Sequence, residues 1–449
     1  MHGGHGHGPA ARKNWSGERC SARFVSVVRT KLALLLLACV AMIIRGVVIW
    51  STGPSQVWFG DAHDYLDVAT QLCREGRYPW TSSLPFFRPP GLPLFIAAVT
   101  GCAPERVVWV KTALSFLDIG TIVLAYGIAR GLRMPRSSAL LACCLVAIHP
   151  LLVQASTDVT TEPLAVFLLA GWLAAIVWGA RPDRPHALLW ILAGAAVGAA
   201  ALTRPAAVVC IPLGIAGAFL LDPSRRSRAA GRAAIYGISA AVALAPWTLV
   251  ASRAAGGFIL VTDGGGYNLW RGNHPDLAKA SAAPDVETFL RESFRFESET
   301  SPAVAKEIAM TIPTRAERQA EWTRRAIDNL RAHPRASARF LVPKARAYWR
   351  PWPDRSISPG WLVLLGAFFL VPVLLAGFAG LIRLAWSRPA EATFFALCLL
   401  IPFLAQLPFQ TTLRFRLPYG EVLLCVLAAG FFLDAGRSIA GRRPSGPRP

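Results

Sequence analysis

Long apolar blocks alternate with short basic segments along almost the whole chain. Residues 32–50 and 361–382 are nearly uninterrupted Leu, Val, Ala and Phe, and a helix needs about 20 such residues to cross a bilayer. The pattern predicts an all-α integral membrane protein, a polytopic helical bundle with about ten transmembrane helices. The predicted spans are 32–50, 106–129, 138–156, 163–180, 187–202, 205–221, 233–251, 361–382, 390–409 and 418–436.

Basic residues lie on one side of these predicted spans. If the N-terminus is cytoplasmic, every inside segment carries arginines, for example Arg130, Arg133 and Arg136, as the positive-inside rule requires. Two long segments then fall outside, residues 51–105 and 252–360. We therefore expect a multi-pass protein of the cell inner membrane with its functional site on the periplasmic face.

The same pattern divides the chain into five segments. We expect a disordered cytoplasmic N-terminus at 1–30, a transmembrane core at 31–251 with a first outer loop at 51–105, and a large periplasmic loop at 252–360 before the last three spans. C-terminal helices at 361–436 and a cytoplasmic tail at 437–449 follow. A cleavable signal peptide is not favoured, because the apolar run from Leu32 is long enough to span and no small-residue cleavage site ends it.

Shorter helical patterns occur in both outer segments. Apolar residues at 65, 68, 69 and 72 recur with helical spacing, which predicts an amphipathic helix on the membrane surface. Residues 91–101 are too short to span and suggest a second one. A further helix is expected from about 316 to 330, ended by His333-Pro334.

Composition narrows the class of protein. The formal net charge is +21, but the basic residues flank apolar blocks instead of forming a soluble basic face, so nucleic acid is not an expected partner. The nine cysteines include no CxxC pair and lie mostly in apolar runs. This favours small buried side chains over a zinc site or a disulfide framework.

The first outer segment contains the motif GDAHDY, which places Asp61, His63, Asp64 and Tyr65 at an expected helix start. Asp61 has two interpretations, a helix cap or a catalytic carboxylate. The motif FRPPGLP follows, and its prolines hold Arg88 in a rigid turn near the bilayer surface. Such an arginine binds either a ligand phosphate or a lipid headgroup.

Other candidate groups fall at the same outer surface. They are Glu162 in TEPL, Arg204 in LTRP, Asn273 and His274 in GGYNLWRGNHP, and Arg414 and Arg416 in RFRLP. Arg204 contradicts the charge bias of outside loops, which suggests an anionic ligand. Within the spans, Arg45 and Asp118 are expected to form a structural pair, with a proton or ion path as the alternative.

In their order and spacing, these motifs resemble the bacterial GT-C glycosyltransferases related to protein O-mannosyltransferases, lipid A aminoarabinose transferases and core-sugar transferases of the RgtA/B/C/D type. The resemblance covers nearly the whole chain. It implies transfer of a sugar from a polyprenyl-phosphate donor to a lipid, glycan or protein acceptor. It assigns Asp61 as the base that activates the acceptor, Arg88 and Arg204 to the donor phosphate, and Glu162 as a further acid.

One departure bears on metal binding. Several relatives carry Asp-Glu in the first outer loop, whereas this chain has Asp61-Ala62, so Asp64 or His63 is the candidate substitute. The sequence leaves a divalent metal open and predicts no other cofactor. The alternative function is a transporter or flippase of lipid-linked sugars, which would favour internal repeats and broken helices at the bilayer midplane.

Overall fold

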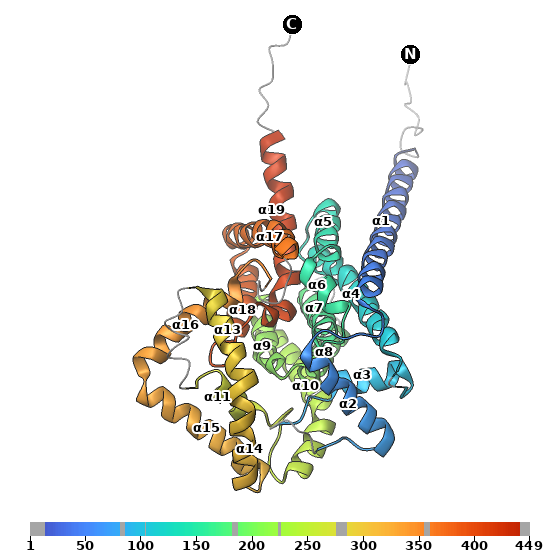
Figure 1. Ribbon diagram of the computed structural model, residues 1–449. Helices are drawn as coiled ribbons and strands as arrows, with labels where there is room; N and C mark the ends of the chain where they lie inside the picture. The colour runs from blue at the N-terminus through green and yellow to red at the C-terminus, as the bar shows by residue number, and fades with distance from the viewer. Residues whose placement is uncertain are drawn as a thin grey trace, which may run out of the picture.

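The computed structural model of the protein is a bundle of α-helices (Figure 1). It describes residues 14–80, 86–103, 105–181, 187–222, 226–274, 285–353 and 360–440, and all regular elements in these residues are helical. Long apolar helices form one part of the bundle, and shorter helices cover the end that lies away from the start of α1 and the end of α19 (Figure 1).

Six described helices are long and apolar enough to cross a membrane, and a bent pair makes a seventh. They are α1 (Asn14–Thr52), α4 (Val107–Gly131), α7 (Glu162–Gly179), α10 (Arg226–Ala255), α17 (Gly360–Ser387), α18 (Pro389–Gln406) and the pair α5 (Arg136–Ala147) and α6 (Pro150–Ser156). Large apolar side chains lie exposed on them, including Phe368 and Trp386 of α17. Because hydrocarbon, not water, suits such surfaces, the protein is a multi-pass membrane protein.

The expected number of about ten spans is met only in part. The predicted spans 187–202, 205–221 and 418–436 form shorter apolar helices, α8 (Ala187–Thr203), α9 (Cys210–Leu220) and α19 (Val422–Ala440). Turns of other helix types interrupt two of them, η1 (Pro205–Val209) before α9 and η4 (Leu417–Glu421) before α19. The start of α1 and the end of α19 lie at the same end of the bundle (Figure 1). This requires an even number of passages, so ten passages stay a prediction.

Two predicted elements differ in detail from the structure. The span expected at 138–156 is bent by 54° between α5 and α6, because Pro150 supplies no N–H to continue the first helix. Residues 14–30 were expected to be disordered but belong to α1, which begins at Asn14. They contain no proline and a single glycine, so the helix of the first span continues beyond the apolar block.

Arg45 and Asp118 form the expected pair inside the bundle. Arg45 Nε donates to Asp118 Oδ2 at 2.9 Å, and Arg45 Nη1 donates to the carbonyl of Ala147 at 3.1 Å. Both side chains are almost completely buried. The contacts tie α1 to α4 and to the end of α5, which is the structural role expected of paired charges in a membrane.

The end of the bundle away from the start of α1 and the end of α19, called the outer end after its predicted side, carries two groups of helices (Figure 1). The first group follows α1 and consists of α2 (Gly60–Glu75) and α3 (Gly91–Thr100), where the sequence predicts surface helices. The second group lies between α10 and α17 and contains α11 (Gly265–Arg271), α13 (Val286–Arg295), α14 (Ser301–Thr311), α15 (Arg315–Ala332) and α16 (Pro334–Trp349). The helix expected at 316–330 is α15. Together the two groups form the outer layer.

The cysteines were expected to be small buried side chains, with no disulfide framework indicated, but two of them are paired in the structure. Cys73 at the end of α2 and Cys102 just after α3 form a disulfide, with their Cα atoms 5.5 Å apart. Their sequence separation of 29 hides the pairing, since no short motif marks it. Disulfides persist in oxidising compartments, so this bond agrees with a periplasmic position for the first outer segment.

We predict that Cys73 and Cys102 in membranes resist thiol labelling until a reductant is added. Mass spectrometry of labelled peptides measures this, with the same membranes reduced before labelling as the control. Replacing both by Ser should lower stability by about 2–4 kcal/mol, because the crosslink restrains the unfolded chain. Labelling of both cysteines without reductant would contradict the disulfide.

Candidate active site

Asp61 lies between two arginines at the outer end of the bundle. Arg88 Nη2 donates to Asp61 Oδ1 at 2.9 Å, and Arg414 Nη1 donates to Asp61 Oδ2 at 3.0 Å. Arg88 also forms an ion pair with Asp64, one helical turn along α2. The motifs GDAHDY, FRPPGLP and RFRLP therefore meet in space.

The same arrangement continues through Glu162. Arg414 binds both carboxylate oxygens of Glu162, and Arg204 Nη1 donates to Glu162 Oε1 at 2.8 Å. Arg204 also donates to the hydroxyl of Thr161 at 3.1 Å. Acids and arginines thus alternate without interruption. We call this set the charge chain; it consists of Asp64, Arg88, Asp61, Arg414, Glu162 and Arg204.

Asp61 does not cap α2. The helix begins at Gly60 with Phe59 as N-cap, and no side chain accepts a capping bond there. Burial acts to raise the pKa of the Asp61 carboxyl, but the positive charges of Arg88 and Arg414 outweigh it and hold that pKa below its ordinary value. Asp61 is therefore ionised at neutral pH, and its carboxylate is directed to the arginines instead of the helix.

The turn that carries Arg88 is fixed by hydrogen bonds on both sides. Asp263 Oδ1 accepts from the N–H of Phe87 at 2.9 Å, and the hydroxyl of Thr262 donates to the carbonyl of Phe87 at 2.7 Å. The hydroxyl of Tyr78 donates to the carbonyl of Arg88 at 2.6 Å. Sequence reasoning missed Asp263, whose only signal is an acid directly before the glycines at 264–266.

A close backbone approach joins the Arg88 and Arg204 motifs. A Cβ atom on Gly91, the first residue of α3, would lie 2.7 Å from Cα and 2.4 Å from Oγ1 of Thr203. Thr203 ends α8 and directly precedes Arg204. Only glycine allows this contact, so Gly91 brings the two arginine-bearing segments together.

The two acids after α6 have different roles. Asp158 Oδ2 accepts from the backbone N–H groups of Trp58 and Phe59 at 2.9 and 3.0 Å, and so holds the entry to α2. Glu162, at the first residue of α7, is 1% exposed and binds the two arginines. Asp158 therefore fixes the backbone just before α2, whereas Glu162 is itself a member of the charge chain.

Arg414 is the central cation of the charge chain. It lies in the 3-10 turn η3 (Leu413–Phe415), with its guanidinium 5.0 Å from the centre of the Phe59 ring. Burial acts to lower its pKa, but the nearby charges of Glu162 and Asp61 outweigh it, so the pKa lies above the ordinary value. From the sequence this residue is only a possible substrate contact, because its partners are far away along the chain.

The remaining candidates take different positions. Tyr65 is buried beneath Arg88, whose guanidinium lies 4.9 Å from the ring centre, whereas His63 is exposed. Asn273 donates to the carbonyl of Pro408 at 2.6 Å, and His274 is buried against the ring of Phe296. Arg416 is buried against Glu421 at 2.6 Å. These last three side chains are not members of the charge chain.

A buried donor of the charge chain is unused. Arg88 Nε is buried and has no hydrogen-bond partner among the described residues. A buried donor without a partner costs about 1–3 kcal/mol, so an anionic ligand that accepts from Nε would gain binding energy there. The three carboxylates and three guanidinium groups balance in charge, and an added phosphate would have to compete with the carboxylates.

The described residues do not fit a metal site. They contain no group of three or more His, Cys, Asp or Glu side chains placed to hold a metal ion. Asp61, Asp64 and Glu162 already accept from arginines. A hard cation such as Mg²⁺ needs several oxygen ligands free of competing cations, so no chemical step is assigned to a metal here.

Known proteins share the fold of this bundle. The model of the family described as dolichyl-phosphate-mannose-protein mannosyltransferase matches residues 88–250, a segment that includes Arg88, Glu162 and Arg204. No curated protein sequence matches the chain at a significant level.

Solved structures of an archaeal enzyme superpose on almost all of the chain. The apo oligosaccharyltransferase of Archaeoglobus fulgidus matches with a TM-score of 0.58 and 13% identity, over 93% of this chain and 52% of that one. The same organism's AglB with an inhibitory peptide and a dolichol-phosphate gives 0.54 and 14%, again over 93% and 52%. This chain thus spans about half the length of that enzyme.

The structure of ArnT from Cupriavidus metallidurans bound to undecaprenyl phosphate matches with a TM-score of 0.43 and 15% identity, over 92% of this chain and 81% of that one.

We predict that Gly91→Ala separates the Arg88 turn from the end of α8 and destabilises the protein. Overpacking against backbone costs about 1–3 kcal/mol, measurable as a lower thermal unfolding midpoint in detergent or nanodiscs. Gly60→Ala is the matched control, since it also replaces the first residue of an outer helix but meets nothing within 4 Å. Equal unfolding midpoints for the two variants would show that the contact at Gly91 is not tight.

Proposed function

We propose that the protein is a membrane glycosyltransferase that moves a sugar from a polyprenyl-phosphate donor to an acceptor at the periplasmic face. The observation that carries this proposal is the charge chain, in which Asp61 lies between Arg88 and Arg414 beside the apolar bundle. A donor of this class has its lipid chain in the bilayer and its reacting carbon at the surface. The site offers a base and phosphate-binding groups at that same level.

The comparisons support the donor class. The matched family is described by a dolichyl-phosphate-linked sugar, and AglB of the matching fold is known in a complex with a dolichol-phosphate. We extend this chemistry to the present chain because its arginines occur where the charge bias of outer loops disfavours them. The acceptor is a hydroxyl-bearing lipid, glycan or protein.

In the proposed reaction the acceptor hydroxyl attacks the anomeric carbon of the donor. A new carbon–oxygen bond forms there as the bond to the phosphate oxygen breaks, and the bonding electrons leave with the phosphate. Arg88 and Arg204 stabilise the charge that develops on the leaving phosphate. Asp61 takes the proton of the acceptor hydroxyl. A single displacement of this kind inverts the anomeric configuration.

Donor binding and base strength are coupled in this arrangement. A phosphate that accepts from Arg88 Nε draws the guanidinium toward itself and weakens its hold on Asp61. The pKa of the Asp61 carboxyl then rises toward the value that burial favours. Asp61 becomes a stronger base only when the leaving group is in place, which limits unproductive chemistry in the empty site.

We predict that Asp61→Asn abolishes transfer while the protein folds and still binds polyprenyl phosphate. Loss of a general base costs on the order of a hundredfold or more in rate. The assay uses purified protein and the polyprenyl-phosphate sugar that accumulates in a deletion strain. Asp64→Asn and Glu162→Gln are comparators that remove the neighbouring acids. Near-normal turnover by Asp61→Asn would move the base elsewhere, and donor flipping without transfer by the wild type would favour a transporter.

A second prediction concerns the pH dependence of the reaction. The groups that face Asp61 are Arg88, Arg414 and Tyr65. Arg414→Gln removes one positive charge, so the pKa of Asp61 rises and less of the ionised base exists at low pH. We expect the acid limb of the kcat/KM profile, which reports the free enzyme, to move to higher pH, whereas that of the wild type stays level down to about pH 5, above the ordinary pKa of a carboxyl.

The control for this prediction is Arg324→Gln. Arg324 is an exposed arginine on α15 that pairs with Glu321 and Asp328 and lies outside the charge chain. Its replacement should leave the acid limb unchanged. An unchanged acid limb in Arg414→Gln as well would mean that Arg414 does not set the charge state of the catalytic base.

A further inference from the structure

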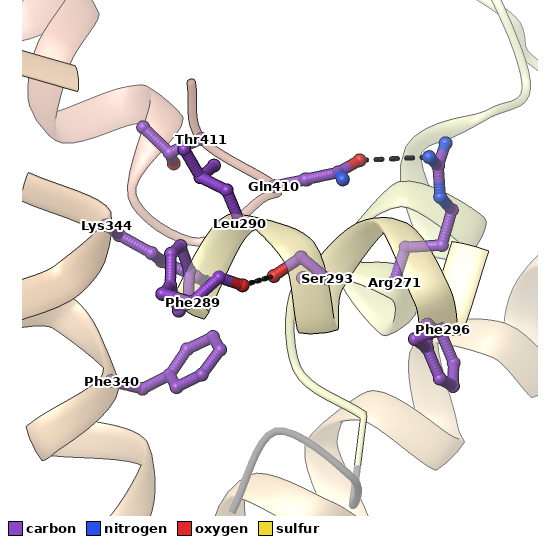
Figure 2. A pocket seen from close by; sticks show the side chains of 10 residues that line it. Arg271, Phe289, Leu290, Ser293, Phe296, Phe340, Lys344, Gln410 and Thr411 are labelled. Atoms are coloured by element: carbon purple, nitrogen blue, oxygen red, sulfur yellow. Dashed lines mark hydrogen bonds between the residues drawn. The ribbon is translucent and has the colours of Figure 1, made fainter. Parts of the chain in front are cut away.

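The segment that delivers Arg414 to the site is held from the outer layer. Residues 407–412 connect the end of α18 to η3 and lie against α11 and α16. Asn273 Nδ2 donates to the carbonyl of Pro408 at 2.6 Å, and Lys344 Nζ donates to the carbonyl of Leu407 at 2.9 Å. Arg271 Nη2 donates to Gln410 Oε1 at 2.9 Å, as Figure 2 shows. Three side chains from outside the segment therefore donate hydrogen bonds to it.

Backbone packing makes the same connection at Gly272. A Cβ atom on this residue would lie 2.6 Å from the carbonyl carbon and 2.8 Å from Cα of Phe409. No larger residue fits without displacing the segment. The end of α11 therefore rests directly on the backbone of residues 407–412.

Lys344 is the unusual member of this set. It is 1% exposed, and its Nζ lies 5.0 Å from the centre of the Phe340 ring. Figure 2 shows Lys344 beside Phe289, Leu290 and Phe340, and the cavity that these residues line has a volume of only about 10 Å³. Burial lowers the pKa of Lys344 to about 7. An apolar residue would be cheaper to bury here.

The position of its acceptor explains why a lysine stands there. Leu407 is the C-cap of α18, so its carbonyl lies at the negative end of the helix, where carbonyl groups lack partners within the helix. The Nζ donor at this point satisfies the carbonyl and fixes the direction in which the chain leaves α18. Six residues later the chain reaches Leu413 and then Arg414.

We propose that Lys344 is a positioning residue, which with Asn273 and Gly272 clamps residues 407–412 so that Arg414 reaches Asp61 and Glu162. The proposal rests on the proposed function, because it gives the outer layer control over the charge of the catalytic base. Lys344 acts only through Arg414 and touches no reacting atom.

The test compares Lys344→Met with Lys306→Met in the full-length protein. Methionine matches the length and volume of the lysine but cannot donate, whereas Lys306 is an exposed lysine on α14 of the same layer. Hydrogen exchange should become at least tenfold faster at residues 407–416 in Lys344→Met and stay unchanged in Lys306→Met. The acid limb of transfer should move to higher pH in Lys344→Met, as for Arg414→Gln. Lys344→Arg keeps a donor and should return the exchange and the acid limb part of the way to the wild-type values.

If Lys344→Met does not fold, Asn273→Ala provides a second test. It removes one hydrogen bond to residues 407–412 and changes no charged residue. Unchanged exchange in the folded variants overturns the clamp. Faster exchange with a wild-type acid limb overturns the positioning role, since the segment would then move without affecting Asp61. Absence of transfer by the wild type defeats the proposed function instead, and the exchange measurement still decides the clamp.

Discussion

The outer end of this protein depends on one constraint: charged side chains in a partly buried site must be paired with opposite charges. Glu162 is almost fully buried and Arg204 nearly so, and removing one partner from such a pair costs about 3–5 kcal/mol because the other charge stays buried. Each arginine is shared or flanked by acids, so no member can move alone. The charge chain therefore sets the positions of α2, α3, α7, α8 and η3 relative to one another.

Much of this site could be predicted from the sequence because its members carry local signals. Asp61, Arg88, Glu162 and Arg204 each follow or precede an apolar block next to Pro or Gly, which places them at helix ends on one membrane face. The all-helical bundle follows from the length of the apolar blocks. Local signals of this kind depend on residues within one or two helical turns, which a sequence displays directly.

The features that sequence reasoning missed depend on contacts between distant segments. Arg414 meets Asp61 across 353 residues, and Cys73 meets Cys102 across 29. Asp158 and Glu162 stand four positions apart with similar chemistry, yet only the fold shows that one binds backbone N–H groups and the other arginines. The number of spans stayed open for a related reason, since Pro150 bends the run predicted at 138–156 and the turns η1 and η4 interrupt the runs predicted at 205–221 and 418–436.

The members of the charge chain are unevenly distributed along the sequence, and the site is complete only when the C-terminal helices have packed. Five of its six members lie before residue 205, whereas Arg414 lies in the turn before the last helix. Until η3 and α19 are in place, Asp61 has only Arg88 and Glu162 has only Arg204 as a cationic partner within this set. Insertion of the C-terminal helices then joins two separate ion-pair groups through one guanidinium. Because Lys344 and Asn273 of the outer layer donate to the segment before Arg414, the packing of that layer and the place of Arg414 in the charge chain are coupled.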